Sequence, residues 1–341
     1  MSSDEAGQTM AAYGRTAAGE AVEIHRIGPR DGNAGVEAGI ITWGARIASL
    51  TVPAPGGRRQ VLLTRGDMAG WEADRSYLGA TVGRFAGRIE GARFTLDGTE
   101  HRLPANDGTA CLHGGSPGFE RAIWTAEPDG DGVVMRHISP DGDQGFPGQL
   151  DISVRFSIRD GVALVLEYEA RTTAPTVLNL SNHAYFNLAG GGDVLRHELT
   201  IASEAYVPVG PGLIQNGPPQ AVSGTPFDFR SPRRIGARIA EADAQLRIAG
   251  GYDHTYLLSP GPALAPRWVA RVEADGLAMD VHTDQPAIQL YTGNFLDSQK
   301  HAALCLETQH VPNAPNRPEF ASTVLRPGQV FRSTTAYRFS G

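Results

Sequence analysis

The feature that most constrains the fold of this chain is a long succession of short segments in which apolar and polar residues alternate. Residues 22–27, 39–43 and 46–52 are the first such segments, and others follow at close spacing. A period of two is typical of a strand that buries one face. The 42 Gly and 23 Pro of the chain mark turns between the segments. The sequence therefore predicts a mainly β protein.

Turn sequences indicate how neighbouring strands connect. Asp97-Gly98 and Asp160-Gly161 each lie between two alternating segments, and a third turn at residues 129–132 precedes another. Asp-Gly dipeptides readily adopt the positive φ angles that a two-residue hairpin requires. Because strands do not alternate with helices along the chain, we expect antiparallel sheets packed face to face. This is a large antiparallel β-sandwich.

One short helix is expected within this β pattern. Ser231-Pro232 has the form of an N-cap followed by Pro at the first helical position, and Ile235, Ile239 and Leu246 fall on one face. The predicted fold class is therefore mainly β with one or two short helices.

Domain organisation follows from composition along the chain. Residues 1–20 are expected to be a flexible N-terminal lead-in. Residues 21–341 are expected to be a single domain, because no linker composition and no repeat of fixed period divides them. Residues 204–230 hold many Pro and Gly and predict a long ordered loop over the sheet, which in a compact domain tends to be functional.

Charge and composition argue against several partners. A net charge of −7 with scattered Arg is unsuited to nucleic acid or to an anionic membrane. No signal peptide and no run of 18 apolar residues is visible, so we expect a soluble, cytoplasmic protein. Cys111 and Cys305 are each flanked by apolar residues, which is typical of buried thiols, and a single bridge between them stays open.

The densest polar stretch is residues 179–188, where three Asn, a Ser, a His and a Tyr stand among Leu and Phe. It follows strand-like residues, and a strand that ends on polar side chains usually delivers them to a cleft. His183 is the catalytic candidate, because imidazole gives or takes a proton near neutrality. A histidine satisfied by the backbone is the alternative.

Further candidates stand in Gly-rich or polar clusters. Arg84 and Arg88 lie four residues apart, and we interpret Arg84 as a surface charge and Arg88 as a side chain that reaches into a cleft. His113 precedes two Gly, so its backbone is open to a ligand, with a structural His as the alternative. Asp253, between a Tyr and a His, is suited to accept hydrogen bonds from hydroxyls, with an Asx turn as the alternative.

Two candidates lie on strands near the C-terminus. Gln289 shares a strand face with Tyr291, and a Gln on an otherwise apolar strand needs a partner. Glu307 follows the apolar run 302–306, where burial would raise its pKa and suit it to act as a general base. An edge-strand Glu in water is the alternative.

Common catalytic motifs are missing from the sequence. There is no GxSxG, GxxxxGK[ST], HExxH or GxGxxG before a helix, which removes the usual hydrolase, P-loop, zincin and dinucleotide interpretations. Amide, carboxylate, imidazole and guanidinium groups remain, interleaved with aromatic residues. This combination is typical of a site for a hydroxyl-rich ligand such as a sugar.

Six motifs in order resemble the galactose mutarotase, or aldose 1-epimerase, family over roughly residues 30–340. They are Leu78-Gly79-Ala80-Thr81-Val82-Gly83-Arg84 with Arg88-Ile89, Leu112-His113-Gly114-Gly115, Asn182-His183-Ala184-Tyr185-Phe186-Asn187-Leu188, Tyr252-Asp253-His254, Gln289-Leu290-Tyr291-Thr292-Gly293-Asn294, and Glu307-Thr308-Gln309 followed by Pro312-Asn313. The resemblance implies the family's galactose mutarotase-like supersandwich, a large antiparallel β-sandwich with a sugar cleft.

The resemblance also implies roles. Glu307 is similar to the family's general base, which takes the proton from the C1 hydroxyl of the sugar. His183 is similar to the general acid, which protonates the ring oxygen; rotation and reclosure then give the other anomer. Hydroxyl-binding roles are implied for Arg88, Asp253 and Gln289, and His113 is implied to be a second substrate-binding imidazole near the ring oxygen or its neighbouring hydroxyl. No metal or organic cofactor is implied, the expected partner is a small aldose, and a monomer or homodimer is expected.

One residue departs from the family pattern. Many members have Asn immediately before the Arg of the first motif, where this chain has Gly87. An amide able to touch a sugar hydroxyl is therefore missing, which puts substrate preference in question.

The leading hypothesis is an aldose 1-epimerase acting on free galactose and glucose. The alternatives are a hexose-6-phosphate mutarotase, a non-catalytic sugar-binding protein, and a glycoside hydrolase. For the hydrolase, Asp253 and Glu307 would have to supply the two carboxylates.

Overall fold

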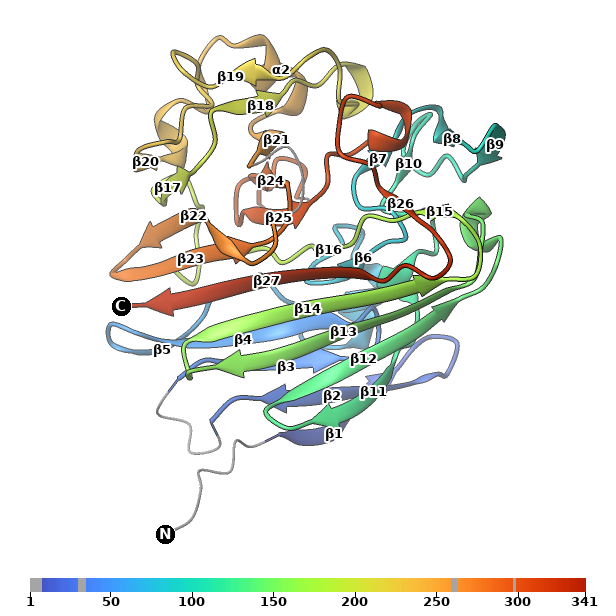
Figure 1. Ribbon diagram of the computed structural model, residues 1–341. Helices are drawn as coiled ribbons and strands as arrows, with labels where there is room; N and C mark the ends of the chain where they lie inside the picture. Colours follow the sequence, from blue (N-terminus) through green and yellow to red (C-terminus); the bar gives the residue numbers. More distant parts are fainter. Residues whose placement is uncertain (1–7, 30–34, 259–262, 297–298) are drawn as a thin grey trace.

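The structure, a computed structural model, describes residues 8–29, 35–258, 263–296 and 299–341 and is built around three antiparallel sheets (Figure 1). The first five-stranded sheet has the order β1 (Thr9–Arg15), β2 (Ala21–Ile27), β3 (Glu37–Ile41), β4 (Arg46–Ala54) and β5 (Gly57–Gln60). The nine-stranded sheet has the order β11 (Thr125–Asp129), β12 (Gly132–Ser139), β13 (Leu150–Arg159), β14 (Ala163–Thr172), β27 (Phe331–Ser340), β23 (Leu277–Thr283), β22 (Arg267–Ala274), β17 (Glu198–Ile201) and β20 (Arg233–Arg234). The second five-stranded sheet has the order β19 (Gln220–Ala221), β18 (Ala205–Val207), β21 (Asp253–Leu257), β24 (Ala287–Tyr291) and β25 (Cys305–Gln309).

Shorter elements complete the fold. The two-stranded pairs are β7 (Arg88–Ile89) with β10 (Cys111–Leu112), β6 (Thr81–Val82) with β16 (Ser181–Asn182), β8 (Arg93–Leu96) with β9 (Thr99–Arg102), and β15 (Thr176–Val177) with β26 (Val324–Leu325). The two α-helices are α1 (Met68–Ala73) and α2 (Ala244–Ala249). The predicted class, a mainly β sandwich with one or two short helices, is confirmed.

The three sheets share one core. Val154 and Phe156 of β13 are fully buried and belong to the same hydrophobic cluster as Leu50 and Val52 of β4, which lies behind β13 and β14 in Figure 1. At the other half of the nine-stranded sheet, the hydroxyl of Tyr337 on β27 donates to the carbonyl of Leu306 on β25 at 3.4 Å. The second five-stranded sheet is thus fastened directly to the sandwich, and that sheet carries much of the site described below.

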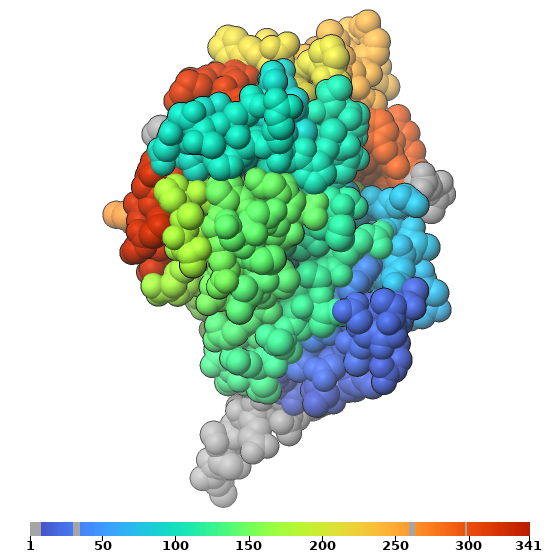
Figure 2. Space-filling model, turned by 90° about the vertical axis from the view of Figure 1, so that its right-hand side faces the viewer, coloured from blue at the N-terminus to red at the C-terminus, as the bar shows by residue number. Residues whose placement is uncertain are grey.

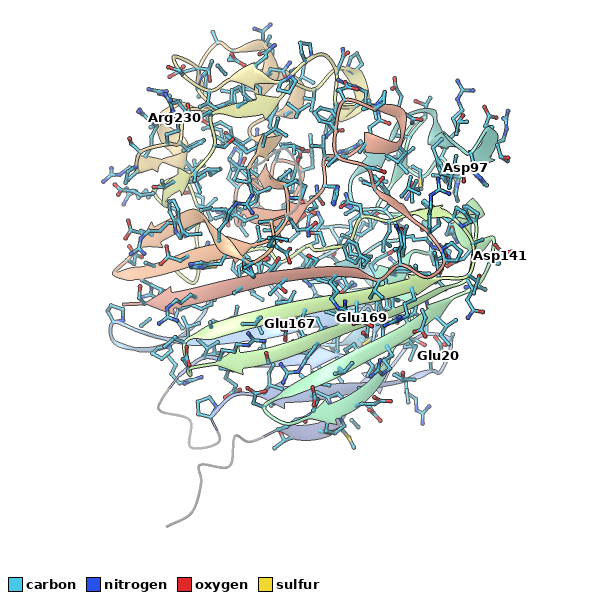
Figure 3. All side chains as sticks on the ribbon, in the orientation of Figure 1. Glu20, Asp97, Asp141, Glu167, Glu169 and Arg230 are labelled. Atoms are coloured by element: carbon cyan, nitrogen blue, oxygen red, sulfur yellow. The ribbon has the colours of Figure 1, made fainter. Side chains whose placement is uncertain are left out.

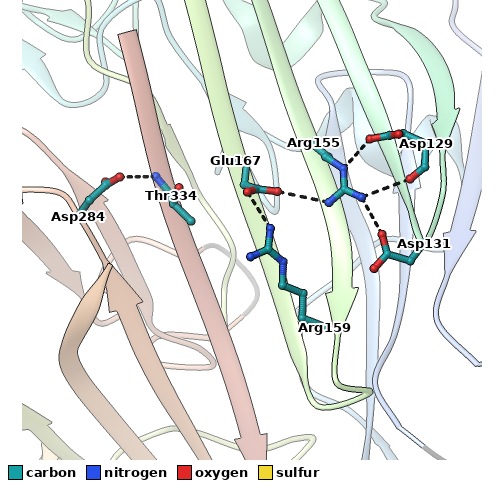
Figure 4. Close-up of polar contacts among 7 residues, drawn as sticks. All are labelled: Asp129, Asp131, Arg155, Arg159, Glu167, Asp284 and Thr334. Carbon is teal, nitrogen blue, oxygen red and sulfur yellow. Dashed lines mark hydrogen bonds and ion pairs between the residues drawn. The ribbon is translucent and has the colours of Figure 1, made fainter. Parts of the chain in front are cut away.

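The opposite face of β13 and β14 is polar. Arg155 donates to Asp129 and Asp131 at 2.6 Å each and to Glu167 at 3.3 Å (Figure 4). Glu167 and Glu169 of β14 are labelled on this face in Figure 3. Exposed ion pairs contribute little stability individually. Because these charged side chains cover the outer face, this half of the sheet packs on one side only. One-sided packing explains the alternation of apolar and polar residues in the sequence of β13.

The two predicted hairpins and the third predicted turn are confirmed. Asp97-Gly98 joins β8 to β9, Asp160-Gly161 joins β13 to β14, and residues 129–132 join β11 to β12. Asp97 and Asp160 have φ angles of 50° and 53°, the left-handed conformation that short polar side chains tolerate. Figure 2 views the molecule from the side of β8 and β9, which belong to the teal region in the upper half of that face, below the yellow residues at the top.

The predicted helix at Ser231 is wrong in position. Residues 233–234 form β20 and Ile235–Ala237 a single 3₁₀ turn, whereas α2 begins after Asp243. The Asp243 carboxylate accepts from the backbone N–H of Gln245 and Leu246, so the cap stands near the far end of the predicted segment. Among the residues that the structure describes, no helix has the length and apolar character that a membrane crossing needs.

The expected lead-in also needs correction. Residues 9–15 form β1, which pairs with β2 along the edge of the first sheet. Most side chains of β1 are exposed, so the strand has no apolar face to reveal it in the sequence. Residues 1–7 lie outside the described residues, and the expectation that residues 21–341 form a single domain stays a prediction.

Arg84 is not a surface charge. Its side chain is 2% exposed, and its guanidinium donates to the carbonyls of Pro147 and Gly148 and to the hydroxyl of Ser139 at 3.0, 2.7 and 2.6 Å. Burial lowers its pKa to about 10, which leaves it charged at neutral pH. Arg84 therefore closes residues 139–148 onto the sandwich.

Replacing Arg84 by Ala should lower the free energy of unfolding by about 3 kcal/mol, because several buried acceptors lose a charged donor. Urea denaturation followed by tryptophan fluorescence measures this change. Arg136→Ala, which removes an exposed ion pair with Glu127, is the control and should change the free energy by less than about 0.5 kcal/mol. Equal effects of the two substitutions would contradict a structural role for Arg84.

Candidate active site

One cavity of about 180 Å³ brings together all six predicted site residues. They are Arg88, His113, His183, Asp253, Gln289 and Glu307. The cavity is also lined by Arg75, Ser76, Tyr77, Gly87, Leu112, Tyr185, Gln215, Tyr291, Phe295, Gln309 and Pro312. Its volume is below the roughly 300–1,000 Å³ typical of pockets for drug-sized ligands, which suits a small polar ligand.

Strands β21, β24 and β25 form one wall of the cavity. Gln289 on β24 stands opposite Glu307 on β25 in the strand ladder. The Nε2 of Gln289 donates to the Asp253 carboxylate at 2.6 Å, and the hydroxyl of Thr255 donates to the Gln289 Oε1 at 2.5 Å. The oxygen and the nitrogen of the Gln289 amide therefore each have a hydrogen-bond partner, as a Gln on an apolar strand requires. This fixes the orientation of Gln289 beside the carboxyl of Glu307.

His183 lies on the segment that follows β16. Its backbone N–H donates to the carbonyl of Ala80 at 2.8 Å, and its own carbonyl accepts from Gly79 at 2.9 Å. The ring stacks with Tyr185 and Tyr77 at centroid distances of 5.0 and 6.0 Å. Backbone bonds and aromatic packing thus hold the imidazole in one place.

The two nitrogens of His183 have different neighbours. Nε2 is 3.7 Å from the Oε1 of Glu307, and Nδ1 is 3.4 Å from the Sγ of Cys305. Cys305 and Cys111 are both free and buried, so the single bridge that the sequence left open does not form. Burial raises the pKa of Cys305 well above its usual value, so it stays a thiol. A thiol that donates to Nδ1 leaves the ring proton of a neutral imidazole on Nε2, facing Glu307.

Burial controls the charges of this pair. Burial and the nearby Asp253 carboxylate raise the pKa of Glu307 to about 8, against a smaller opposite effect of Arg88. Burial lowers the pKa of His183 to about 3, helped by Arg46 and Arg88. Between these values the pair holds one proton, which burial places on the carboxyl as long as the cavity is dry.

Arg88 on β7 and His113 directly after β10 also line the cavity. The Nε of Arg88 donates to Asp107 at 2.6 Å, which anchors the guanidinium at the cavity rim. The Nδ1 of His113 accepts from the backbone N–H of Gly87 at 3.2 Å, so in the neutral ring Nε2 carries the proton. Burial, with the nearby His183 and Arg88, holds the pKa of His113 well below its usual value. His113 is therefore a neutral donor at the cavity.

The described residues include one group spaced closely enough for a metal ion. The ligand atoms of His113, His183 and Glu307 lie within 4.8 Å of one another. The lone pair of His113, however, already accepts the Gly87 N–H, and a metal needs that lone pair. The expectation that no metal or organic cofactor is required stays a prediction.

Sequence reasoning missed several residues of the cavity. Tyr185 and Tyr291 stand inside stretches that the sequence marked as polar clusters. Gln309 lies two residues after Glu307 on β25, so strand alternation was the signal that places it on the same face. Gln215 lies within residues 204–230, where loop length was the only signal. Tyr77 offered none.

Solved structures share this fold. Galactose 1-epimerase from Lactobacillus acidophilus NCFM matches with a TM-score of 0.86 and 25% identity, over 98% of this chain and 99% of that chain. An aldose epimerase homologue from C. elegans matches with a TM-score of 0.84 and 28% identity, over 92% of this chain and 98% of that chain. The fold and the enclosed acid–imidazole pair define a β-sandwich protein of the mutarotase class.

Sequence comparison gives the family. The family model described as aldose 1-epimerase matches residues 30–338. Galactose mutarotase from Rattus norvegicus is 41% identical over 316 residues, which cover 88% of this chain and 90% of the relative. Aldose 1-epimerase from Escherichia coli (strain K12) is 36% identical over 325 residues, which cover 90% and 93%. The chain belongs to the aldose 1-epimerase family, and the family resemblance of its motifs is confirmed.

The raised pKa of Glu307 predicts a pH-dependent stability. The unfolded chain ionises this carboxyl above about 4.5, whereas the folded protein keeps it protonated up to about 8. Its contribution to stability is therefore full below pH 4.5 and lost as the pH rises through 8. The amide in the Glu307→Gln variant does not titrate. The melting temperature of this variant, relative to that of wild type, should therefore be higher at pH 9 than at pH 5. Thermal melts at the two pH values measure this, with exposed Glu127→Gln as control. A constant difference would contradict the burial argument.

Proposed function

We propose that the protein is an aldose 1-epimerase that interconverts the α and β anomers of free aldohexoses such as galactose and glucose. The observation that carries the proposal is the buried pair of His183 and Glu307, 3.7 Å apart in a small polar cavity. Membership of the aldose 1-epimerase family supports the same reaction.

In the proposed mechanism Glu307 takes the proton of the C1 hydroxyl while His183 protonates the ring oxygen, and the ring opens. Both oxygens are bonded to C1, so the acid and the base must be close neighbours, as these two groups are. Rotation about the C1–C2 bond turns the other aldehyde face toward the ring hydroxyl. Closure with the roles reversed gives the other anomer.

The single proton of the pair fits this cycle. Ring opening needs a carboxylate and an imidazolium, and it leaves a carboxylic acid and a neutral imidazole. The second arrangement is the one that burial favours. Arg88, which lowers the pKa of Glu307, favours the carboxylate needed for the first step. We infer that Arg88 reduces this preference without reversing it, so ring opening starts from the less favoured of the two protonation states.

Binding of the sugar is assigned to the groups around the pair. We propose that Arg88, His113, Asp253 and Gln289 hold the hydroxyls. Asp107 anchors Arg88, and Thr255 anchors Gln289, so these donors and acceptors are oriented before the sugar arrives. A hexose 6-phosphate is the alternative substrate, and competition by glucose 6-phosphate but not by glucose would favour it. We further propose a cytoplasmic protein that is a monomer or homodimer.

Removing either member of the pair should abolish catalysis. Glu307→Gln and His183→Ala are each expected to lower kcat/KM for α-D-galactose by about 10²–10⁴-fold, which is the usual contribution of a general acid or base. Polarimetry on freshly dissolved sugar measures the rate above the spontaneous reaction. Glu127→Gln is the control and should match wild type. Retention of more than a tenth of the wild-type activity in Glu307→Gln would refute the assignment.

The pair also predicts the pH dependence of kcat/KM. Activity needs the singly protonated pair, which exists between pKa values of about 3 and about 8. The profile should be flat from pH 5 to 7 and fall tenfold per pH unit above 8.

Asp253→Asn tests the origin of the alkaline limit. It removes a negative charge that raises the pKa of Glu307, so it should move this limit to lower pH as well as weaken binding. An unmoved limit would show that another group controls it.

A further inference from the structure

Two buried amides that line the cavity have no part in the mechanism above. Gln215 and Gln309 line the cavity and are only 5% and 1% exposed. The Oε1 of each is buried without a hydrogen-bond partner among the described residues. An unpaired buried amide oxygen costs free energy, which makes a purely structural role for either residue unfavourable.

Strand geometry places Gln309 on the far side of Glu307 from His183. Cys305, Glu307 and Gln309 share one face of β25, and residues two apart on a strand are separated by about 7 Å. His183 contacts Cys305 and Glu307, at the other half of this row. Gln309 therefore lies beyond the reacting groups, where a bound sugar would present hydroxyls that do not react.

Gln215 is held beside the cavity by an arginine. Arg317 donates to the carbonyls of Gln215 and Gly217 at 2.8 Å each. The backbone of Gln215 also bridges to Val209, which closes the loop on itself. Arg317 lies on the segment that follows β25. Arg317 therefore links the loop that contains Gln215 to the segment after Gln309. The position of Gln215 beside the cavity is thus set by the backbone.

Gly87 explains why amides are needed there. A Cβ at this position would lie 2.5 Å from the Cγ of Pro312, and the φ angle of Gly87 is 78°. Position 87 has no room for a side chain unless Pro312 moves. The Asn that the family resemblance implies at this position therefore has no equivalent group at residue 87. Gln215, Gln309, Gly87 and Pro312 all line the same cavity.

We propose that Gln215 and Gln309 form a hydroxyl-binding subsite for the aldose, which supplies the amide groups missing at Gly87. The inference rests on the proposed function, because it takes the ligand to be an aldose. Each amide offers a donor and an acceptor. The terminal torsion of Gln is soft, so the unpaired oxygen turns toward a bound hydroxyl at little cost.

The test uses Gln215→Met and Gln309→Met, which keep the side-chain length and remove the amide. Each should raise KM for galactose about threefold to tenfold, as expected for a lost hydrogen bond, with kcat changed less than about twofold. The melting temperature should not fall, because the substitution removes the buried amide oxygen that has no hydrogen-bond partner, and no hydrogen bond of that oxygen is lost. Gln285→Met is the matched control: Gln285 is 1% exposed, has an unpaired Oε1 and lies outside this cavity. It should leave KM unchanged.

Deoxy sugars identify the contact. In a thermodynamic cycle with 2-, 3-, 4- and 6-deoxygalactose, the KM penalty of a variant should disappear for the sugar that lacks the contacted hydroxyl. A KM unchanged in both variants, or a penalty that is the same for every deoxy sugar, would overturn the proposal while leaving the epimerase assignment intact.

The two proposals fail in distinguishable ways. If the wild type epimerises no aldose, the proposed function fails, and calorimetric titration with galactose then decides the subsite. Weaker galactose binding by both variants than by wild type would support the subsite without catalysis. Equal binding, or no binding to any of the three proteins, would overturn it.

Discussion

The removal of one carboxyl and one imidazole from water is the constraint on which the rest of the site depends. Burial moves the pKa of Glu307 up and that of His183 down, so each group resists its charged form. A buried acid without a partner would simply destabilise the sheet. The pair is surrounded by groups that remain in place whether the proton is on Glu307 or on His183. These groups are the guanidinium of Arg88 at the rim, the fixed amide of Gln289 and the thiol of Cys305. Six separate segments of the chain, one for each of the six predicted site residues, converge on this cavity.

The sequence predicted the β-sandwich well where side chains alternate between core and water. The hairpins at Asp97 and Asp160 followed from local turn chemistry alone. The prediction failed for β1, because most side chains of this strand are exposed and give no alternation between core and water. It also failed for α2, because an earlier Ser-Pro sequence resembled a helix start more than the true cap did. Arg84 was misjudged because no local pattern distinguishes a solvated arginine from one whose partners lie more than 50 residues away.

Prediction of the site had two sources. Residue chemistry marked His183 and Glu307 as candidates, but no spacing in the sequence places positions 88, 113, 183, 253, 289 and 307 around one cavity. The family resemblance supplied that grouping, and the structure brings all six side chains to it. Gln309 stands in the last of the family motifs but received no role, and Gln215 stands in none; only the structure shows that their amide oxygens are buried without a partner.

The order of strands in the nine-stranded sheet has a consequence for how the chain is made. β27, residues 331–340, lies between β14 and β23 in the middle of the sheet. During synthesis on the ribosome, β14 therefore keeps an unpaired edge while more than 150 further residues are translated. Such edges invite association with other nascent chains. The nine-stranded sheet can be completed only once β27 has been made, and the charged outer surface of β14 helps to keep the waiting strand in solution.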